Sequence, residues 1–559
     1  MIAIIKDLSV CFKGPVLNKV LHQISFEIKP NEILAIVGES GSGKSVTSKV
    51  LMGLLPAKKT FVEASTLDVL GESVLNYKWQ DWKTLRGNKV SMVFQEPMSS
   101  LNPTLSCGAQ VVEILQQHLS LPAQDARYQV LDLFEKVKLP NPESTFHKYP
   151  HELSGGQMQR VMIAMAIACK PQLLIADEPT TALDVTVQKD IIDLLKSLQE
   201  EYGMSILFIS HDLTLVKSIA DRIIVMRQGK IVEQGSNSQI FDSPQQDYTR
   251  ALLASRPPIT ERPKRLATVG DYLNKEDDAL ELELISTEQR RNAHNKMYAQ
   301  PPILKAANLV VQYRLKKELF KPQQYYTAVD NLSLDVYPTE SLGLVGESGC
   351  GKSTLGNALI GLRTIISGKI VFNNVDLTEL RGSELRKLRK DIQIIFQDPF
   401  SSLNPRLTVG QAIQEPMRVH GIGSNHKDRK LRVINLLEKV GLSADQYDRY
   451  PHEFSGGQRQ RIGIARTVAL QPKFIVCDES VSALDLSVQA QVLNLLNDLK
   501  QEFGFSYLFI SHDLSVVKYF CDRVMVMNKG KIVEIQEADQ LYKLPTSDYT
   551  KMLIAAIPN

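Results

Sequence analysis

The sequence predicts an α/β fold in which one domain is present twice along the chain. Three observations lead to this prediction: long motifs recur at a constant separation, apolar strand-like segments alternate with helical ones, and a glycine-rich loop joins a strand to a helix in each half. Short strands that are apolar on both faces and separated by helices are typical of a parallel sheet covered by helices. We therefore expect two such domains, one in each half.

The repeat is long and keeps its order. Residues 34–45 (LAIVGESGSGKS) return as 342–353 (LGLVGESGCGKS), and residues 149–160 (YPHELSGGQMQR) return as 450–461 (YPHEFSGGQRQR). In both halves, 24 residues separate the serine of the second motif from the glutamate of an acidic pair downstream. A period near 300 residues indicates a duplicated domain and excludes a solenoid, whose repeats are far shorter.

We expect three parts: a first domain over residues 1–255, a charged linker over 256–302 and a second domain over 303–559. The linker has proline at both edges and mixes eight acidic with eight basic residues, a composition typical of an exposed connector. One short helix is expected inside it, over residues 272–285.

The first half also predicts individual elements. Apolar strands are expected over residues 33–37, 173–176 and 206–209, and a helix is expected to begin near Lys44. Residues 223–232, with a Gln-Gly turn, indicate a hairpin, which the second half repeats over residues 524–533.

The glycine loops (residues 38–45 and 346–353) both fit the phosphate-binding pattern G-x-x-x-x-G-K-S. Glycine lets backbone N–H groups converge on phosphate oxygens, and the following helix adds the positive end of its dipole. The lysine reaches the outer phosphates, and the serine hydroxyl binds Mg²⁺. Because two matches each follow an apolar strand and precede a helix, we interpret them as nucleotide sites and not as chance glycine turns. Their binding residues are Gly38, Gly41, Gly43, Lys44, Ser45 and Val46, and Gly346, Gly349, Gly351, Lys352, Ser353 and Thr354.

Two acidic residues end a further apolar strand in each half, where parallel sheets bind ligands. We expect Asp177 and Asp478 to bind Mg²⁺, and Glu178 and Glu479 to act as general bases toward the attacking water. The alternative is an acidic helix cap, but a phosphate loop upstream favours the catalytic interpretation.

One histidine follows a later strand in each half. His211 and His512 both lie 33 residues after the glutamate, in the sequence Ser-His-Asp. A lone histidine at such a position is more often structural, but its repetition at a fixed distance favours a role at the γ-phosphate. Three adjacent residues cannot form a hydrolase triad by themselves.

The motifs LSGGQ (153–157) and FSGGQ (454–458), taken with the loops, the paired acids and the histidines, resemble the ATP-binding cassettes of ABC transporters. The resemblance covers both halves. It implies two P-loop NTPase cassettes in tandem, each with a RecA-like core, an antiparallel β part and a helical subdomain near residues 96–150 or 398–450. It also implies that the chain binds ATP and Mg²⁺ and hydrolyses ATP.

The resemblance assigns further roles. Gln95 and Gln397 would contact Mg²⁺ and the attacking water, and Phe12 and Tyr313 would stack on adenine, unless they are ordinary strand aromatics. The signature residues would complete the γ-phosphate site of the opposite cassette, so that Lys44 works with Ser455 and Lys352 with Ser154. The segments Ala182-Leu183-Asp184 and Ala483-Leu484-Asp485 would cross between the two sites. The signature residues are Ser154, Gly155, Gly156 and Gln157, and Ser455, Gly456, Gly457 and Gln458.

Composition and local motifs indicate which kind of ABC ATPase the sequence resembles most. The net charge of +3 (65 basic and 62 acidic residues) argues against bulk binding of nucleic acid, and no apolar run approaches the ~18–20 residues needed to cross a bilayer. One alternative is a soluble twin-cassette factor that acts on ribosomes. However, the runs QEPMSSLNP, QDPFSSLNP and DYTRALL resemble the ATPases of peptide and nickel importers.

This closer resemblance implies partners and a location. We expect two transmembrane permease subunits and, through them, an extracytoplasmic substrate-binding protein. The chain would be peripheral on the cytoplasmic face of the bacterial inner membrane. Several relatives carry a cysteine cluster for an iron–sulfur centre after the first cassette, but residues 170–349 contain no cysteine, so we expect no such cluster.

Overall fold

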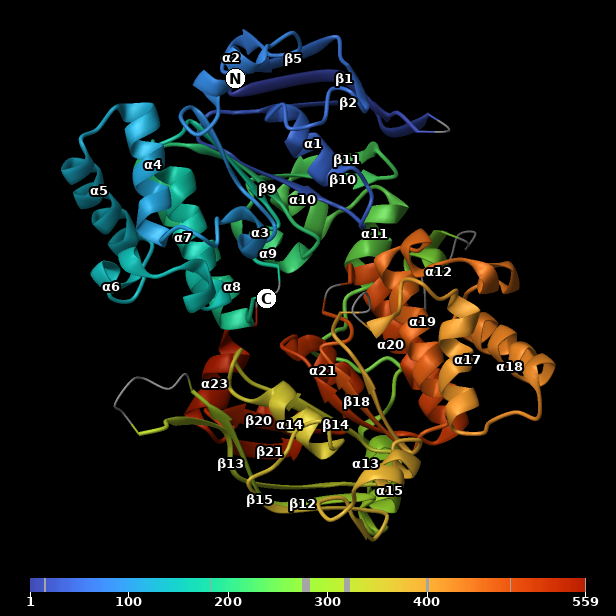
Figure 1. The fold of residues 1–559 in the computed structure, drawn as a ribbon. Coiled ribbons are helices and arrows are strands. Elements are labelled where there is room, and N and C mark those ends of the chain that lie inside the picture. The colour runs from blue at the N-terminus through green and yellow to red at the C-terminus, as the bar shows by residue number, and fades with distance from the viewer. Residues whose placement is uncertain are drawn as a thin grey trace.

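The computed structural model describes residues 1–14, 17–181, 183–273, 282–315, 322–398, 402–482 and 484–557. Figure 1 shows two similar halves, one coloured from blue to green and the other from yellow to red, with the C-terminus between them. Each half has its own apolar core on both sides of a central sheet.

The central sheet of each half has six strands in the same order. The order is β11-β10-β3-β9-β8-β7 in the first half and β21-β20-β14-β19-β18-β17 in the second. Five strands are parallel, and the outer strand of a hairpin adds an antiparallel edge. Every residue of β3 (Ile33–Val37) and β14 (Ser341–Val345) is buried, which confirms the predicted parallel sheet with helices on both faces.

The expected strands and hairpins of the core are all present. The remaining strands of the two sheets are β7 (Val90–Val93), β8 (Leu173–Asp177), β9 (Ser205–Ile209), β10 (Arg222–Arg227) and β11 (Lys230–Ser236), and β17 (Ile392–Ile395), β18 (Phe474–Asp478), β19 (Ser506–Ile510), β20 (Arg523–Asn528) and β21 (Lys531–Glu537). The helices that pack around them are α1 (Lys44–Leu51), α2 (Trp79–Leu85), α8 (Val185–Tyr202), α9 (Leu213–Ile219), α10 (Asn237–Asp242) and α11 (Asp247–Ala254), and α14 (Lys352–Leu359), α15 (Gly382–Leu388), α20 (Leu486–Phe503), α21 (Leu514–Phe520), α22 (Ala538–Lys543) and α23 (Asp548–Ala555).

A second, antiparallel sheet lies beside each core sheet, as the cassette resemblance implies. Its strands are β1 (Ala3–Phe12), β2 (Asn18–Ile28), β4 (Thr60–Glu63), β5 (Thr66–Val69) and β6 (Glu72–Ser73) in the first half, and β12 (Leu304–Arg314), β13 (Tyr325–Val336), β15 (Ser367–Phe372) and β16 (Val375–Asp376) in the second. The long pairs β1–β2 and β12–β13 are irregular in register, which bends them over the core.

A helical subdomain projects from each core sheet. Its helices are α3 (Pro97–Ser100), α4 (Cys107–Leu119), α5 (Ala123–Lys136), α6 (Pro142–His147) and α7 (Gly155–Ile167), and α17 (Val409–Val419), α18 (His426–Lys439) and α19 (Gly456–Val468), with short 3-10 turns before α7 and α19. No helix among the residues that the structure describes is both long and apolar enough to cross a bilayer.

The segment between the halves is only partly the exposed connector that we expect: residues 283–289 are exposed, whereas other residues pack against both halves. We call residues 262–273 and 282–298 the strap. Leu266 and Ala267 are 1% exposed, and Arg290 is 9% exposed. Composition could not show this, because the charges of the strap face opposite charges 200 residues or more away along the chain.

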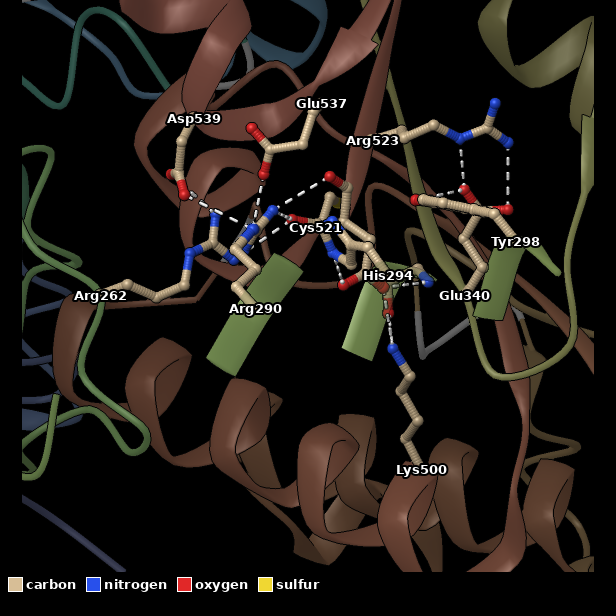
Figure 2. A network of polar contacts seen from close by, with 12 residues as sticks. Arg262, Arg290, His294, Tyr298, Glu340, Lys500, Cys521, Arg523, Glu537 and Asp539 are labelled. Carbon is tan, nitrogen blue, oxygen red and sulfur yellow. Dashed lines mark hydrogen bonds and ion pairs between the residues drawn. The ribbon is translucent and has the colours of Figure 1, made fainter. Parts of the chain in front are cut away.

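Figure 2 shows how the basic side chains of the strap meet acidic groups of the second half. Arg290 pairs with Glu537 at 2.5 Å and also donates to the carbonyl oxygens of Cys521 and Asp522. His294 lies 3.2 Å from the Asp522 carboxylate, which Lys500 approaches from α20 at the same distance. The strap therefore neutralises a buried acidic cluster.

The helices of the strap differ from the single helix that we expect over residues 272–285. Helix α12 (Val269–Leu273) ends at the start of the range 272–285, and α13 begins only at Thr287 (Thr287–Tyr298). Residues 282–285 instead form a short antiparallel bridge in which Leu284 pairs with Pro263. Residues 274–281, which the expected helix included, lie outside the described part of the chain.

The strap also joins the cores of the two halves. Leu266 belongs to the apolar core of the second half, whereas Val269 belongs to that of the first. The buried Asn494 side chain, on α20, accepts from the Leu266 amide and donates to the Leu266 carbonyl, both at 2.9 Å. The chain thus crosses the boundary between the halves within three residues.

Candidate functional site

The glycine loops lie between a core strand and a helix in both halves. Gly38 has φ +147°, and a Cβ built there would lie 2.1 Å from the carbonyl oxygen of Met226; Gly346 makes the same approach to Met527. Gly43 and Gly351 are left-handed caps that begin α1 and α14. Only glycine fits these positions without displacing the neighbouring strand, so the loop is held in a compact turn.

The loop lysines are folded back onto their own loops. Lys44 donates to the carbonyl oxygens of Gly38 at 2.7 Å and Glu39 at 2.9 Å, and Lys352 makes the equivalent bonds at 2.7 and 3.0 Å. Both side chains are buried. Burial lowers the pKa of Lys44, although Glu178 and other nearby carboxylates oppose this shift.

A hydroxyl and a carboxylate meet at each expected metal position. Ser45 donates to Asp177 at 3.0 Å, and Ser353 donates to Asp478 at 2.9 Å. Burial raises the pKa of both carboxyls. In the first half, Ser45, Gln95 and Asp177 line one cavity of about 460 Å³. Hydroxyl, amide and carboxylate oxygens are the donors that Mg²⁺ prefers, so these residues fit the ion.

A second hydroxyl, that of Ser48, also contacts Asp177, and it was not predicted from the sequence. Ser48 donates to the other oxygen of Asp177 at 3.3 Å, and the second half has Gly356 in its place. Its position one helical turn after Lys44 could have indicated it.

The two glutamates receive side-chain hydrogen bonds from the expected partners. Glu178 accepts from Gln95 at 2.7 Å and lies 3.3 Å from His211. In the second half, Gln397 lies 2.8 Å from the Glu479 carboxylate, and His512 lies 3.6 Å from it. The structure therefore brings the predicted glutamine, glutamate and histidine together in each half. Thr181, a residue that sequence reasoning did not select, also donates to Glu178 at 3.0 Å.

Electrostatics couple each glutamate to its histidine. Burial alone would raise the pKa of Glu178, but the hydrogen bond and charge of His211, with Lys44 nearby, lower it to about 2. The pKa of Glu479 is lowered for the same reasons. Burial would lower the pKa of His211 and of His512, but the glutamates outweigh it and raise both.

The segment after the acids of the second half reaches the glycine loop of the first half. The Ser40 amide donates to the Asp485 carboxylate at 3.2 Å, and the Ser487 hydroxyl donates to the Glu39 carboxylate. On the other side, Asp184 lines a small pocket with Gly346 and Glu347. Ala182 and Ala483 lie outside the described residues.

The signature serines cap their own helices. Ser154 accepts from the Gln157 amide at 3.3 Å and begins α7, and Ser455 accepts from the Gln458 amide at 3.4 Å and begins α19. The amides of the signature glycines therefore stand at a helix N-terminus, where an anion is stabilised.

The two aromatic residues assigned to adenine lie at the ends of β strands near the loops. Phe12 packs partly against the first core. The Tyr313 ring is covered by Arg363 at 4.3 Å, and its hydroxyl bonds Thr354 at 3.0 Å. A residue that sequence reasoning missed, Tyr326, is 47% exposed and donates to the Gly349 carbonyl at 3.2 Å.

Comparison with known proteins gives two family matches. The ABC transporter family matches residues 21–181 and 329–482, and the family described as the C-terminal region of oligopeptide/dipeptide transporters matches residues 232–279. Among curated relatives, the glutathione import ATP-binding protein GsiA of Escherichia coli (strain K12) is 44% identical over 552 residues, which cover 96% of this chain and 86% of that protein. GsiA of Shigella dysenteriae serotype 1 has the same identity and coverage.

Among solved structures, a dimeric ATP-binding cassette bound to ADP and phosphate is 28% identical to this chain. The match covers 42% of this chain and 98% of that chain, with a TM-score of 0.39.

Proposed function

Because the chain belongs to the ABC transporter family and is one of its ATPases, we propose that it energises an importer of peptides or peptide-like substrates, with two MgATP bound at sites shared between its cassettes. The observation that carries the shared sites is the contact of Asp485 and Ser487, from the second cassette, with the glycine loop of the first. A crossing segment in this position supports a head-to-tail arrangement of the two cassettes.

The side chains in each site then have distinct tasks. The glycine-loop amides and Lys44 would hold the phosphates. Ser45, Gln95 and Asp177 would hold Mg²⁺, which when bound supplies positive charge to the phosphate oxygens. Glu178 would accept a proton from the attacking water, and the second site repeats this set with Ser353, Gln397, Asp478 and Glu479.

His211 and His512 would stabilise the γ-phosphate. Each histidine lies beside its glutamate, at 3.3 Å in the first half and 3.6 Å in the second. When γ-phosphate enters, the imidazole can turn its hydrogen bond toward the phosphate and release the carboxylate to the water. The signature amides of the opposite cassette would complete the site.

An aromatic ring in each site would stack on adenine. Phe12 remains our candidate in the first site. In the second, the Tyr313 ring already contacts Arg363, whereas the exposed ring of Tyr326 lies beside the glycine loop. We therefore place the stacking role on Tyr326 in preference to Tyr313.

The transported class and the partners are inferred from the relatives. The named relatives import glutathione, a peptide, and the matching tail family belongs to oligopeptide and dipeptide transporters. We infer that two permease subunits bind the helical subdomains at the cytoplasmic face of the membrane. An extracytoplasmic binding protein would deliver the substrate.

Disulfide cross-linking in a cysteine-free background tests the shared sites. Ser40→Cys is paired with Ser455→Cys across the cassettes, and Ser40→Cys with Ser154→Cys serves as the control within one cassette. We expect MgATP to increase cross-linking of the first pair only. Preferential cross-linking of the second pair would contradict the head-to-tail arrangement.

Affinity capture from native membranes tests the partners. We expect two membrane permease subunits to be recovered with the tagged chain. Recovery of ribosomes without permeases would favour the soluble translation-factor alternative.

A further inference from the structure

The same short helix ends both cassettes, and the function described so far gives it no task. Helices α11 and α23 begin with the sequence Asp-Tyr-Thr. Tyr248, on α11, is 3% exposed, and its hydroxyl accepts from the backbone amide of Glu39 at 3.4 Å. Tyr549, on α23, accepts from the Glu347 amide at 3.1 Å. Each tail tyrosine thus reaches the glycine loop of its own cassette across about 200 residues of sequence.

The tyrosine and the loop lysine hold one peptide unit from its two ends. In the first cassette, the carbonyl of Gly38 accepts from Lys44 at 2.7 Å, and the amide on the same peptide bond, that of Glu39, donates to Tyr248. The second cassette repeats this arrangement around Gly346 and Glu347. Because a peptide unit is planar, fixing both ends fixes its rotation.

The Gly38–Glu39 peptide unit begins the loop. Its rotation therefore affects the direction in which the following backbone amides of the loop point toward a phosphate. The Glu39 amide itself is occupied by the tyrosine and is not offered to phosphate. Burial raises the pKa of Tyr549 to about 12, so its hydroxyl is neutral at physiological pH.

A carboxylate on the core sheet anchors each tail helix. Glu233, on β11, accepts from the amides of Gln245 and Gln246, directly before α11. Glu534, on β21, accepts from the amides of Thr546 and Ser547, directly before α23. Each tyrosine therefore contacts the loop from a helix whose start is hydrogen-bonded to the core sheet.

We propose that Tyr248 and Tyr549 are positioning residues for ATP binding, each orienting the first peptide unit of the glycine loop in its own cassette. Neither touches the reacting atoms. The inference rests on the two ATP sites proposed above. It also gives the tail segment, which in the first cassette lies within the match to oligopeptide/dipeptide transporters, a contact with the glycine loop.

Phenylalanine variants of the full chain test the proposal, because they keep the ring and remove only the hydroxyl. We expect Tyr248→Phe and Tyr549→Phe each to weaken ATP at one site by about three- to tenfold, since one hydrogen bond to the loop is lost. The equilibrium binding isotherm of each single variant would then show two affinities. That of the double variant would show one weaker affinity, with a raised KM and a kcat within about twofold of wild type.

Tyr507→Phe is the matched control in the second cassette, because Tyr507 is fully buried and its hydroxyl donates to the Leu496 carbonyl, away from the loop. Tyr202→Phe serves in the first cassette, where the hydroxyl bonds Lys136. Both controls should leave ATP affinity unchanged. The proposal is overturned if the tail variants and the controls lose thermal stability alike while ATP affinity stays at the wild-type value. If the wild-type chain itself binds no ATP, the proposed function fails first.

Discussion

The two glutamates that we propose as general bases have strained backbones. Glu178 has φ +49° and Glu479 has φ +47°, in the left-handed region that costs a residue with a Cβ about 1–2 kcal/mol. This conformation follows the last residue of the strand and turns the carboxylate toward the glutamine and histidine. This conformation thus places the proposed general base between the glutamine and the histidine.

Removing the carboxylates should abolish turnover. We expect Glu178→Gln and Glu479→Gln each to reduce the ATPase rate by tenfold or more, and the double variant by at least about a hundredfold, because a general base contributes 10²–10⁴. The steady-state ATPase rate at saturating MgATP measures this. A single variant with the wild-type rate would show that one site is dispensable.

The histidine–glutamate pairs also predict a pH dependence of stability. The raised histidine pKa makes a contribution that is complete below its ordinary value of 6.5 and is lost as pH rises through the folded-state value. The lowered glutamate pKa makes a contribution that is complete above 4.5 and is lost as pH falls toward about 2. Both are complete between about pH 4.5 and 6.5.

The melting temperatures of wild type and of the variant His211→Gln/His512→Gln therefore differ most within this window. We expect the difference to shrink as pH rises above the window. His22→Gln, outside the sites, is the control. A difference that stays constant from pH 5 to 9 would mean that the histidines contribute packing and no charge.

At the scale of elements, the core strands and the glycine loops were predictable, because their signals are local. An all-apolar run such as Ile33–Val37 can only be buried on both faces, and a glycine pattern fixes the loop that follows it. The glutamate and the histidine that meet in this site were predicted from the acidic pair and from the repeat, whereas Gln95 was assigned through the resemblance to ABC cassettes. Ser48 and Tyr248 were missed, because their role depends on what lies opposite them in space.

The strap could not be predicted for the same reason. Its prolines and balanced charges are those of a connector, yet Arg290 meets Glu537, which lies 247 residues further along the chain. A charge pattern that is balanced within itself gives no sign that Arg290 and His294 have their partners elsewhere, while Lys264 pairs with Glu283 inside the strap.

Arg290→Ala should destabilise the second cassette. It removes the ion pair of Glu537, whereas Asp539 and the Cys521 carbonyl keep Arg262 and the Asp522 carbonyl keeps the Ala538 amide. For this partly exposed pair we expect a cost of about 3 kcal/mol. Denaturant unfolding followed by a probe in the second cassette measures this. The exposed neighbour Arg291→Ala is the matched control, and equal losses in the two variants would contradict the assignment.

For the whole molecule, the strap predicts that the cassettes remain together without nucleotide. Leu266 lies in one core and Val269 in the other, so separating the cassettes would expose one of them. A protease site inserted between Leu273 and Leu282 of the full chain allows the connection to be cut after folding. We expect the nicked protein to elute as one species in size-exclusion chromatography without ATP. The variant Asn494→Ala, which loses both hydrogen bonds to Leu266, should dissociate more readily after the same cut.

The strap also bears on how such a chain is made. Two domains of similar sequence, translated one after the other, can exchange segments and misfold. Of the acidic groups that Arg290 and His294 contact, Asp522 has a counterpart in the first domain, Asp221, whereas Glu537 and Asp539 are replaced there by Ser236 and Ser238. The strap leaves the ribosome before any of the second domain, and Asp522 follows Arg290 by 232 residues. The end of the second domain therefore offers Arg290 two carboxylates that the first domain lacks, and we expect this difference to favour pairing of the strap with the second copy over the first.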